Sequence, residues 1–142
     1  MTRVTLAQAN TIIAAALAKG AELKMKPLSV AVLDAGGHAI AFQRQDGASS
    51  MRWQVASAKA AGALSLGMSS RKIGEMAAER PQFVAALAPL APSGLLPVAG
   101  GVIIVGDDGQ PIGAVGITGD TSDNDELAAL TGIAAAGLKA QG

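Results

Sequence analysis

The 142-residue chain has no cysteine, no tyrosine and a single histidine, His38. Without cysteine it can form no disulfide bond, no catalytic thiolate and no zinc site with cysteine ligands. With one histidine, a two-histidine metal site could form only between two copies of the chain. Aromatic residues are also few, because the chain has one tryptophan and two phenylalanines, which leaves few rings to enclose a flat ligand.

Charge is scarce and balanced. Charged residues make up 15% of the chain, and its formal net charge at pH 7 is zero. Nucleic-acid binding requires a basic surface that neutralises phosphates, so we expect no nucleic-acid partner. No apolar run approaches the roughly 18 residues of a membrane span, and residues 1–5 lack the apolar stretch of a signal peptide. We therefore expect a cytoplasmic protein that contacts no membrane.

Half of the residues are apolar, and most of these are small. The length predicts one domain over residues 1–142, large enough to bury about two-thirds of its unfolded surface. A positive mean hydropathy of +0.38 together with zero net charge leaves little repulsion between copies. We therefore expect a homo-oligomer.

Two pairs of apolar, β-branched runs are each joined by a glycine-containing turn and followed by a helical pattern. Such pairs are typical of antiparallel hairpins, because glycine allows the positive φ angles of tight turns. They predict an α+β fold with an antiparallel sheet of four or five strands flanked by helices. The expected strands are residues 28–33, 38–44, 98–105 and 112–118.

Helices are predicted from apolar spacing and from capping residues. Thr5 and Gln8 form a capping-box signature, and Trp53 falls on the apolar stripe of the second helix. Four prolines between residues 80 and 97 predict a loop, with one helical turn near 83–87. The expected helices run from Thr5 to about Leu23, from Met51 to Leu66 before Gly67, from Ser69 or Ser70 to Glu79, and from Thr121 to about Leu138.

His38 is the first candidate for chemistry. Imidazole is a common haem and metal ligand and transfers protons near neutral pH. The alternative is that His38 only forms hydrogen bonds beside the hairpin turn. Methionine can also ligate haem iron, but we interpret the internal methionines as core or interface residues; they are Met25, Met51, Met68 and Met76.

A second cluster lies where the first hairpin leads into the second helix: Arg44, Asp46, Ser50, Arg52 and Lys59. Arginine beside a helix N-terminus is suited to a carboxylate, such as a haem propionate or a small organic acid. Arg52 and Lys59 lie two helical turns apart and share a face. The alternative is an ion pair between Asp46 and one of the arginines, with Lys59 in solvent.

Acidic residues gather before the last helix: Asp120, Asp123, Asp125 and Glu126. Carboxylates at a helix N-terminus stabilise the helix dipole, and we interpret the group as a cap. Two alternatives stay open. The cluster could hold a hard cation, or Asp125 or Glu126 could reach a ligand pocket.

Three segments resemble the GlcG/HbpS family, which includes the C-terminal domain of PduO. They are VAVLDAGGHAIAFQRQDGA, ASAKAAGALSLGMSS and GGVIIVGDDGQPIGAVGITGDTSDNDE, and they occur in this order along the chain. The resemblance implies a profilin-like sandwich and symmetric assemblies from dimers to octamers. It also implies haem, or another flat or carboxylated small molecule, as the ligand.

The leading hypothesis is a small oligomeric ligand-binding protein whose ligand is haem, as a possible cofactor, or another flat or carboxylated small molecule. Its pocket would lie between the first hairpin and the second helix. His38 is the candidate iron ligand; the other candidate contacts are Arg44, Asp46, Ser50, Arg52, Lys59 and Glu126. A second hypothesis is a cofactor-free enzyme acting on a small organic acid, with His38 or Lys59 as base. A third is an accessory, structural oligomer of a catabolic pathway.

Overall fold

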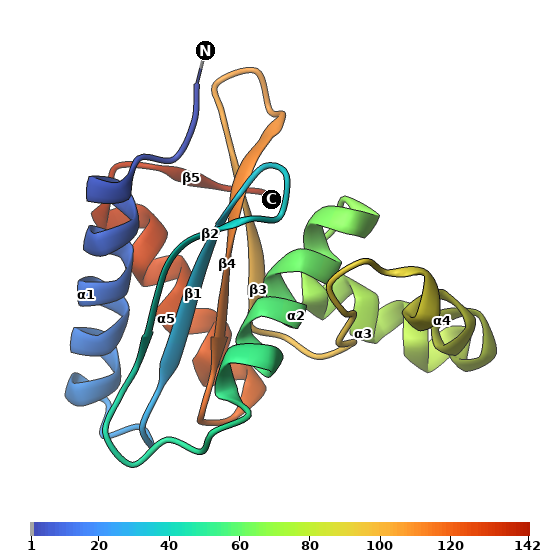
Figure 1. The fold of residues 1–142 in the computed structure, drawn as a ribbon, viewed down its shortest axis with the longest axis horizontal. Coiled ribbons are helices and arrows are strands. Elements are labelled where there is room, and N and C mark those ends of the chain that lie inside the picture. Colours follow the sequence, from blue (N-terminus) through green and yellow to red (C-terminus); the bar gives the residue numbers. More distant parts are fainter. Residues whose placement is uncertain (1) are drawn as a thin grey trace.

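The computed structural model describes residues 2–142 and shows one five-stranded antiparallel sheet with helices on both faces. Its strand order is β2-β1-β4-β3-β5. Helices α1 and α5 cover one face and α2 covers the other, while α3 and α4 form an arm beyond α2 (Figure 1). This confirms the predicted α+β class.

The elements follow the chain in the order α1, β1, β2, α2, α3, α4, a 3₁₀ turn, β3, β4, α5 and β5. Two hairpins, β1–β2 and β3–β4, account for four of the five strands, as the turn residues predicted. The bounds are α1 Leu6–Glu22, β1 Ser29–Asp34, β2 Ala39–Arg44, α2 Arg52–Leu66, α3 Ser70–Glu79, α4 Pro81–Leu87, β3 Gly101–Val105, β4 Pro111–Thr118, α5 Ser122–Ala135 and β5 Lys139–Ala140.

The main hydrophobic core lies between the sheet and the pair α1 and α5. Alternate residues of the strands face it, because successive side chains point to opposite faces. Helices α1 and α5 approach each other closely at Gly132, where an added Cβ would lie 2.6 Å from the Ile12 carbonyl oxygen. The largest fully buried members are Ile12, Ile13, Leu28, Val30, Val32, Ile104, Val115, Ile117 and Ile133.

Helix α2 packs on the opposite face with backbone almost touching backbone. An added Cβ at Gly116 would overlap the Ala56 carbonyl oxygen, and one at Gly101 would overlap the Lys59 carbonyl oxygen. The buried side of α2 is built from alanines, including Ala56, Ala60 and Ala63. Small residues on both surfaces therefore set the distance between helix and sheet.

Most predicted helix ends are confirmed by cap geometry. Thr5 and Gln8 form the full capping box of α1, and the Ser69 hydroxyl accepts from the Lys72 backbone N–H at the start of α3. Gly67 ends α2 in the left-handed conformation with φ 71°. These local signals act within a few residues, so they can be recognised without the tertiary fold.

Three predictions about elements were wrong. Residues 80–97 were expected to be mostly loop with one helical turn near 83–87; that turn belongs to a longer helix, α4, which begins at Pro81. The first helical position suits proline, because the backbone N–H there has no partner within the helix. The strand expected from Val98 begins at Gly101, because Gly100 has φ 128°. The last helix ends at Ala135 rather than near Leu138, and Lys139–Ala140 adds β5 beside β3.

Trp53 is also not on the buried stripe of α2, since it is 38% exposed. Its ring meets Phe42 of β2 edge-to-face, with centroids 5.1 Å apart. The alanines occupy the side that touches the sheet, because only small side chains fit there. Within residues 2–142, no helix is long and apolar enough to cross a membrane.

We predict that Gly116→Ala destabilises the protein by about 3 kcal/mol or more, because its Cβ has to displace the α2 backbone. Urea unfolding followed by circular dichroism would measure the change. The matched control is Gly106→Ala, whose added Cβ would meet only side-chain atoms at 3.3 Å or beyond. Equal stability of both variants would contradict this description of the α2–sheet contact.

Candidate functional site

His38 stands at the end of the β1–β2 turn with its side chain 82% exposed. Its Nδ1 lies 3.3 Å from Asp34 Oδ1. The same carboxylate oxygen accepts from the backbone N–H groups of Gly36 and His38, both at 2.9 Å. The His38 backbone hydrogen bond is the main reason that the pKa of Asp34 lies below its ordinary value. Asp34 therefore fixes both the turn and the orientation of the imidazole ring.

A small cavity of about 220 Å³ lies beside this turn. The imidazole packs close to Gly36, where an added Cβ would lie 3.0 Å from His38 Nδ1. The cavity is thus next to the only imidazole of the chain. It is lined by Ala35, Gly36 and Gly37 of the turn, Ala61, Leu64 and Ser65 of α2, and Pro92 and Ser93.

Arg44 and Arg52 lie at the other end of the sheet. Arg44 Nη1 donates to the Ala48 carbonyl oxygen at 2.9 Å, and Arg52 Nη1 donates to Thr118 Oγ1 at 2.7 Å. Strand β2 rises about 3.3 Å per residue, so His38 and Arg44 are separated by about 20 Å. A single chain does not bring the imidazole and these guanidinium groups into one pocket.

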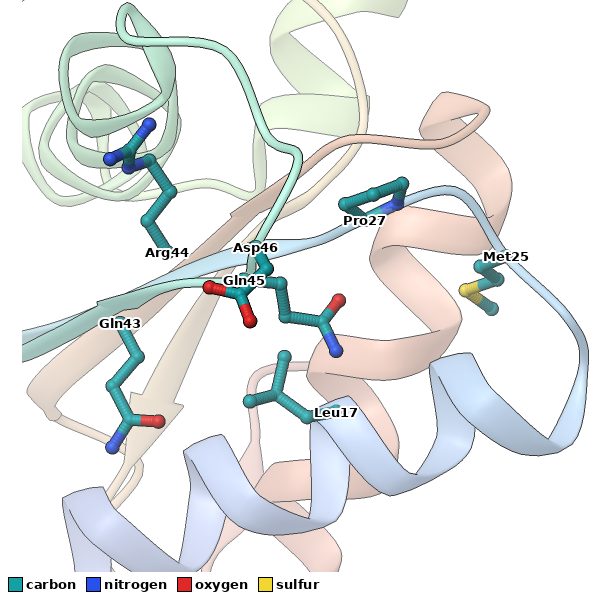
Figure 2. A pocket seen from close by; sticks show the side chains of 7 residues that line it. All are labelled: Leu17, Met25, Pro27, Gln43, Arg44, Gln45 and Asp46. Atoms are coloured by element: carbon teal, nitrogen blue, oxygen red, sulfur yellow. The ribbon is translucent and has the colours of Figure 1, made fainter.

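A cavity of about 500 Å³ lies at the Arg44 end of β2, against the C-terminal part of α1. This volume is within the usual range for small-molecule sites. Figure 2 shows Gln45 directed toward Leu17 of α1, while the Arg44 guanidinium points to the other side of the strand. Its lining combines apolar and polar side chains: Leu17, Met25, Pro27, Gln43, Arg44, Gln45 and Asp46.

Asp46 and Ser50 are exposed in the segment between β2 and α2. The ion pair considered between Asp46 and an arginine does not occur among the ion pairs of residues 2–142. Asp46 instead lines the larger cavity with Arg44. The structure therefore places two of the predicted ligand contacts together at that cavity.

Lys59 is buried, with 3% of its side chain exposed, so the alternative that placed it in solvent was wrong. Its Nζ donates to the Ile117 carbonyl oxygen at 2.9 Å and lies 3.2 Å from Asp125 Oδ2. Asp125 Oδ1 in turn accepts from the Asp120 backbone N–H at 2.9 Å. Lys59 and Asp125 thus join α2 to α5 across the end of β4, away from both cavities.

Burial is the main influence on both members of this pair. It lowers the pKa of the Lys59 ammonium and raises the pKa of the Asp125 carboxyl, while the attraction between them opposes both shifts. A sequence signal for this contact existed, because Lys59 interrupts the alanine stripe at Ala56, Ala60 and Ala63. A charge at a core position requires a buried partner.

The other carboxylates before α5 are also engaged. Arg71 Nε donates to both carboxylate oxygens of Glu126, at 2.9 and 3.0 Å, and its Nη2 pairs with Asp123. Asp120 accepts from the Lys26 backbone N–H at 2.9 Å. Across residues 2–142 no group of three or more metal-ligating side chains occurs, and Asp123 and Asp125 lie in the first turn of α5, where carboxylates cap a helix.

The family model described as haem degrading protein HbpS-like matches residues 4–134 of this chain. The chain belongs to the HbpS-like family. This match covers both hairpins and the buried Lys59–Asp125 pair, whereas β5 lies outside the matched residues. No protein among those with curated descriptions matches the chain.

Solved structures agree with the family assignment. HbpS of Streptomyces reticuli, solved as a double mutant, is 28% identical with a TM-score of 0.80, over 94% of this chain and 87% of that one. Protein ORFY of Klebsiella pneumoniae is 28% identical with a TM-score of 0.85, and the match covers 96% of this chain and 93% of that protein. A PduOC–haem complex shares the fold at 22% identity and a TM-score of 0.87, and the match covers 99% of this chain and 100% of that chain.

We predict that breaking the buried pair of this HbpS-like chain is costly. Lys59→Met or Asp125→Leu alone should destabilise the fold by about 3–5 kcal/mol, because each leaves one buried charge without its partner. The double variant should be more stable than either single variant, since it leaves no unpaired charge. Urea unfolding of all three variants would measure this.

The control for that prediction is Lys19→Met, which breaks the 3.5 Å pair with Glu22 at the surface. Exposed pairs contribute at most about 1 kcal/mol. A double variant as unstable as the sum of the single variants would contradict the buried-pair interpretation.

The pH dependence of stability gives a further prediction. The Lys26 backbone N–H is the main cause that lowers the pKa of Asp120 to about 2, from an ordinary value of 3.8. The ionised group therefore stabilises the fold above about pH 4, and this contribution is lost as the pH falls toward 2. Asp120→Asn should lower stability at pH 7 and flatten its decline below pH 4, whereas Asp107→Asn at an exposed turn should leave the profile unchanged.

Proposed function

We propose that this HbpS-like protein binds haem and that His38 supplies the iron ligand. The observation that carries the proposal is the Asp34–His38 pair. His38 is the only imidazole, it is exposed, and its Nδ1 faces a carboxylate at 3.3 Å. Metal-ligating histidines commonly have such a carboxylate partner, which fixes the ring and leaves the other nitrogen, Nε2, for the metal.

The comparisons support haem as the ligand. The family description names haem degradation, and one protein of the same fold was solved as a haem complex. In this chain the candidate donors are the His38 imidazole at one end of β2 and, at the other end, Arg44, which lines a cavity of about 500 Å³. When bound, haem would supply a redox-active iron centre, and the residues of this chain would hold and orient it.

We also propose that the protein assembles from identical copies. Several large apolar side chains are exposed in a chain without net charge, so little electrostatic repulsion opposes association. The Arg44 end and the His38 end of one chain also stand too far apart for one small pocket. The exposed residues are Leu6, Leu23, Met51, Trp53, Phe83, Leu90, Val98, Leu127 and Leu130.

The small-acid enzyme hypothesis has less support. Lys59 is buried against Asp125 and lines neither the 220 Å³ nor the 500 Å³ cavity. A general base has to come within hydrogen-bond distance of the proton that it removes. Of the two candidate bases, only His38 is exposed.

Haemin titration followed in the Soret region tests the proposal. Wild type should give a saturable band, and His38→Ala should bind at least about 10-fold more weakly with a shifted band. Asp34→Asn should weaken haem binding about 10- to 100-fold although His38 is unchanged, because the variant loses the carboxylate that orients the ligating histidine. Gln110→Ala, at the tip of the other hairpin, is the matched control and should bind as wild type does.

Two results would contradict the proposal separately. An unchanged band and affinity in His38→Ala would remove His38 as the iron ligand. Absence of a saturable band in wild type would remove haem itself and direct attention to small carboxylic acids at the Arg44 end.

A further inference from the structure

The first turn of α2 has no cap among residues 2–142. No side chain there bonds to its free N–H groups, although Ser50 stands just before the N-cap residue. The backbone N–H groups of Trp53 and Gln54 have no acceptor in the described chain. Unpaired N–H groups at a helix start favour an anion, because their dipoles point toward it.

Three side chains form a row across the sheet at this end of α2. Ser29 of β1 pairs with Arg44 of β2 on one side and with Thr118 of β4 on the other. Paired residues share one face of the sheet, and neighbouring strands lie about 4.8 Å apart, so the row spans about 10 Å. The row faces α2, because Arg52 Nη1 of that helix donates to Thr118 Oγ1.

The hydroxyl in the middle of this row has no partner. Ser29 is fully buried, and within residues 2–142 its Oγ is the one buried side-chain polar atom without a hydrogen bond. Buried polar groups are normally paired, so an unpaired one requires a specific explanation. A hydroxyl can donate to an oxyanion, which would supply the missing acceptor. The Ser29 hydroxyl therefore indicates a ligand independently of the uncapped helix.

Arg44 and Arg52 add positive charge that is not balanced by a carboxylate. Neither guanidinium takes part in the ion pairs of residues 2–142. Each donates to a neutral oxygen instead, the Ala48 carbonyl and the Thr118 hydroxyl respectively. Figure 2 shows the Arg44 guanidinium pointing away from α1, and hence toward the face of the sheet that α2 covers. A guanidinium has five N–H donors, so both can bind a further acceptor.

Two aromatic rings lie beside the row. Phe42 precedes Arg44 by two residues on the same face of β2, and its ring meets the Trp53 ring with centroids 5.1 Å apart. Trp53 follows Arg52 in the first turn of α2 and is 38% exposed. Donors for an oxyanion thus lie next to an accessible apolar surface that suits a ring.

We infer that the start of α2 binds the carboxylate of a small aromatic acid, at a site separate from the proposed haem ligand His38. Arg52 and the free N–H groups of the helix hold the carboxylate, and the Ser29 hydroxyl donates to one of its oxygens. Arg44 supplies positive charge on the β2 side. The ring of the acid lies against Trp53.

Binding requires a small movement, because the Ser29 hydroxyl is enclosed in the free chain. Arg52 is half-buried, and within residues 2–142 one hydrogen bond, to Thr118, holds its guanidinium. It can therefore turn from the neutral hydroxyl to the carboxylate, since a hydrogen bond between two charged groups is the stronger one.

Fluorescence tests this site directly, because Trp53 is the only tryptophan and the chain has no tyrosine. Titration of the full chain with benzoate should change the Trp53 emission with saturation. Acetate, which has no ring, and inorganic phosphate should displace benzoate with affinities at least about 10-fold weaker. No saturable change with benzoate, or binding of acetate or phosphate as tight as that of benzoate, would overturn the inference.

Two variants test the named contacts. Ser29→Ala and Arg52→Met should each weaken benzoate binding at least about 10-fold, because each removes a donor to a charged group. Ser29→Ala should leave the urea midpoint unchanged or raise it, since the hydroxyl that it removes has no partner in the free chain. A Ser29→Ala variant that binds benzoate as wild type does would overturn the site.

The matched control is Arg80→Met. It removes the same charge from an exposed arginine that lies over the Phe83 ring, in the arm formed by α3 and α4. This variant should bind benzoate as wild type does. Equal weakening by Arg80→Met and Arg52→Met would show only a general effect of charge and would overturn the site.

The aromatic-acid site and haem binding are tested separately. Saturable benzoate binding by a protein that gives no Soret band with haemin would support this site and remove the proposed haem. A Soret band from a protein that binds no benzoate would overturn this site and leave the proposed haem binding intact.

Discussion

The close approach of α2 to the sheet positions everything on that side of the molecule. Gly101 and Gly116 lack the side chains that would hold the helix away, so the Ala56 and Lys59 carbonyl groups lie directly on the strands. At this distance the Lys59 side chain passes Gly100 and ends between the Ile117 carbonyl oxygen and Asp125. The buried ion pair is therefore a consequence of the glycine contact, and it fixes α5 relative to α2.

A rigid sheet held in this way separates the two ends of β2. At one end, Asp34 orders the turn and the His38 ring. At the other end, Arg44 and Arg52 are oriented by the Ala48 carbonyl oxygen and the Thr118 hydroxyl. The strand cannot shorten, so the His38 imidazole and the Arg44 guanidinium of one chain do not meet in a single pocket.

The amino-acid composition also leaves apolar side chains exposed on the single chain. The alanines and glycines between α2 and the sheet allow close packing but bury little area per residue. Several leucines and aromatic residues remain exposed, and almost no net charge keeps copies apart. The proposed self-association would add buried area that the single chain lacks.

Local signals in the sequence determined much of this protein. Turn glycines, capping residues and the alternation of apolar residues predicted two hairpins, the main helices and the α+β class, because each acts over a few neighbouring residues. The sequence also singled out His38 and the Arg44–Asp46 segment as candidate ligand contacts. It underestimated α4, which begins at a proline and extends the predicted helical turn. It also misplaced Trp53, because the close approach of α2 to the glycines of the sheet leaves room only for alanine.

Only the tertiary structure decided how these residues combine. It buried Lys59 against Asp125, engaged Glu126 with Arg71, and placed His38 and Arg44 at opposite ends of one strand. The two ion pairs join residues 55 or more positions apart in the chain. The separation of His38 from Arg44 depends on the full length of the extended strand β2. Local patterns carry no information on such distances, because they are set by which faces of distant elements pack together.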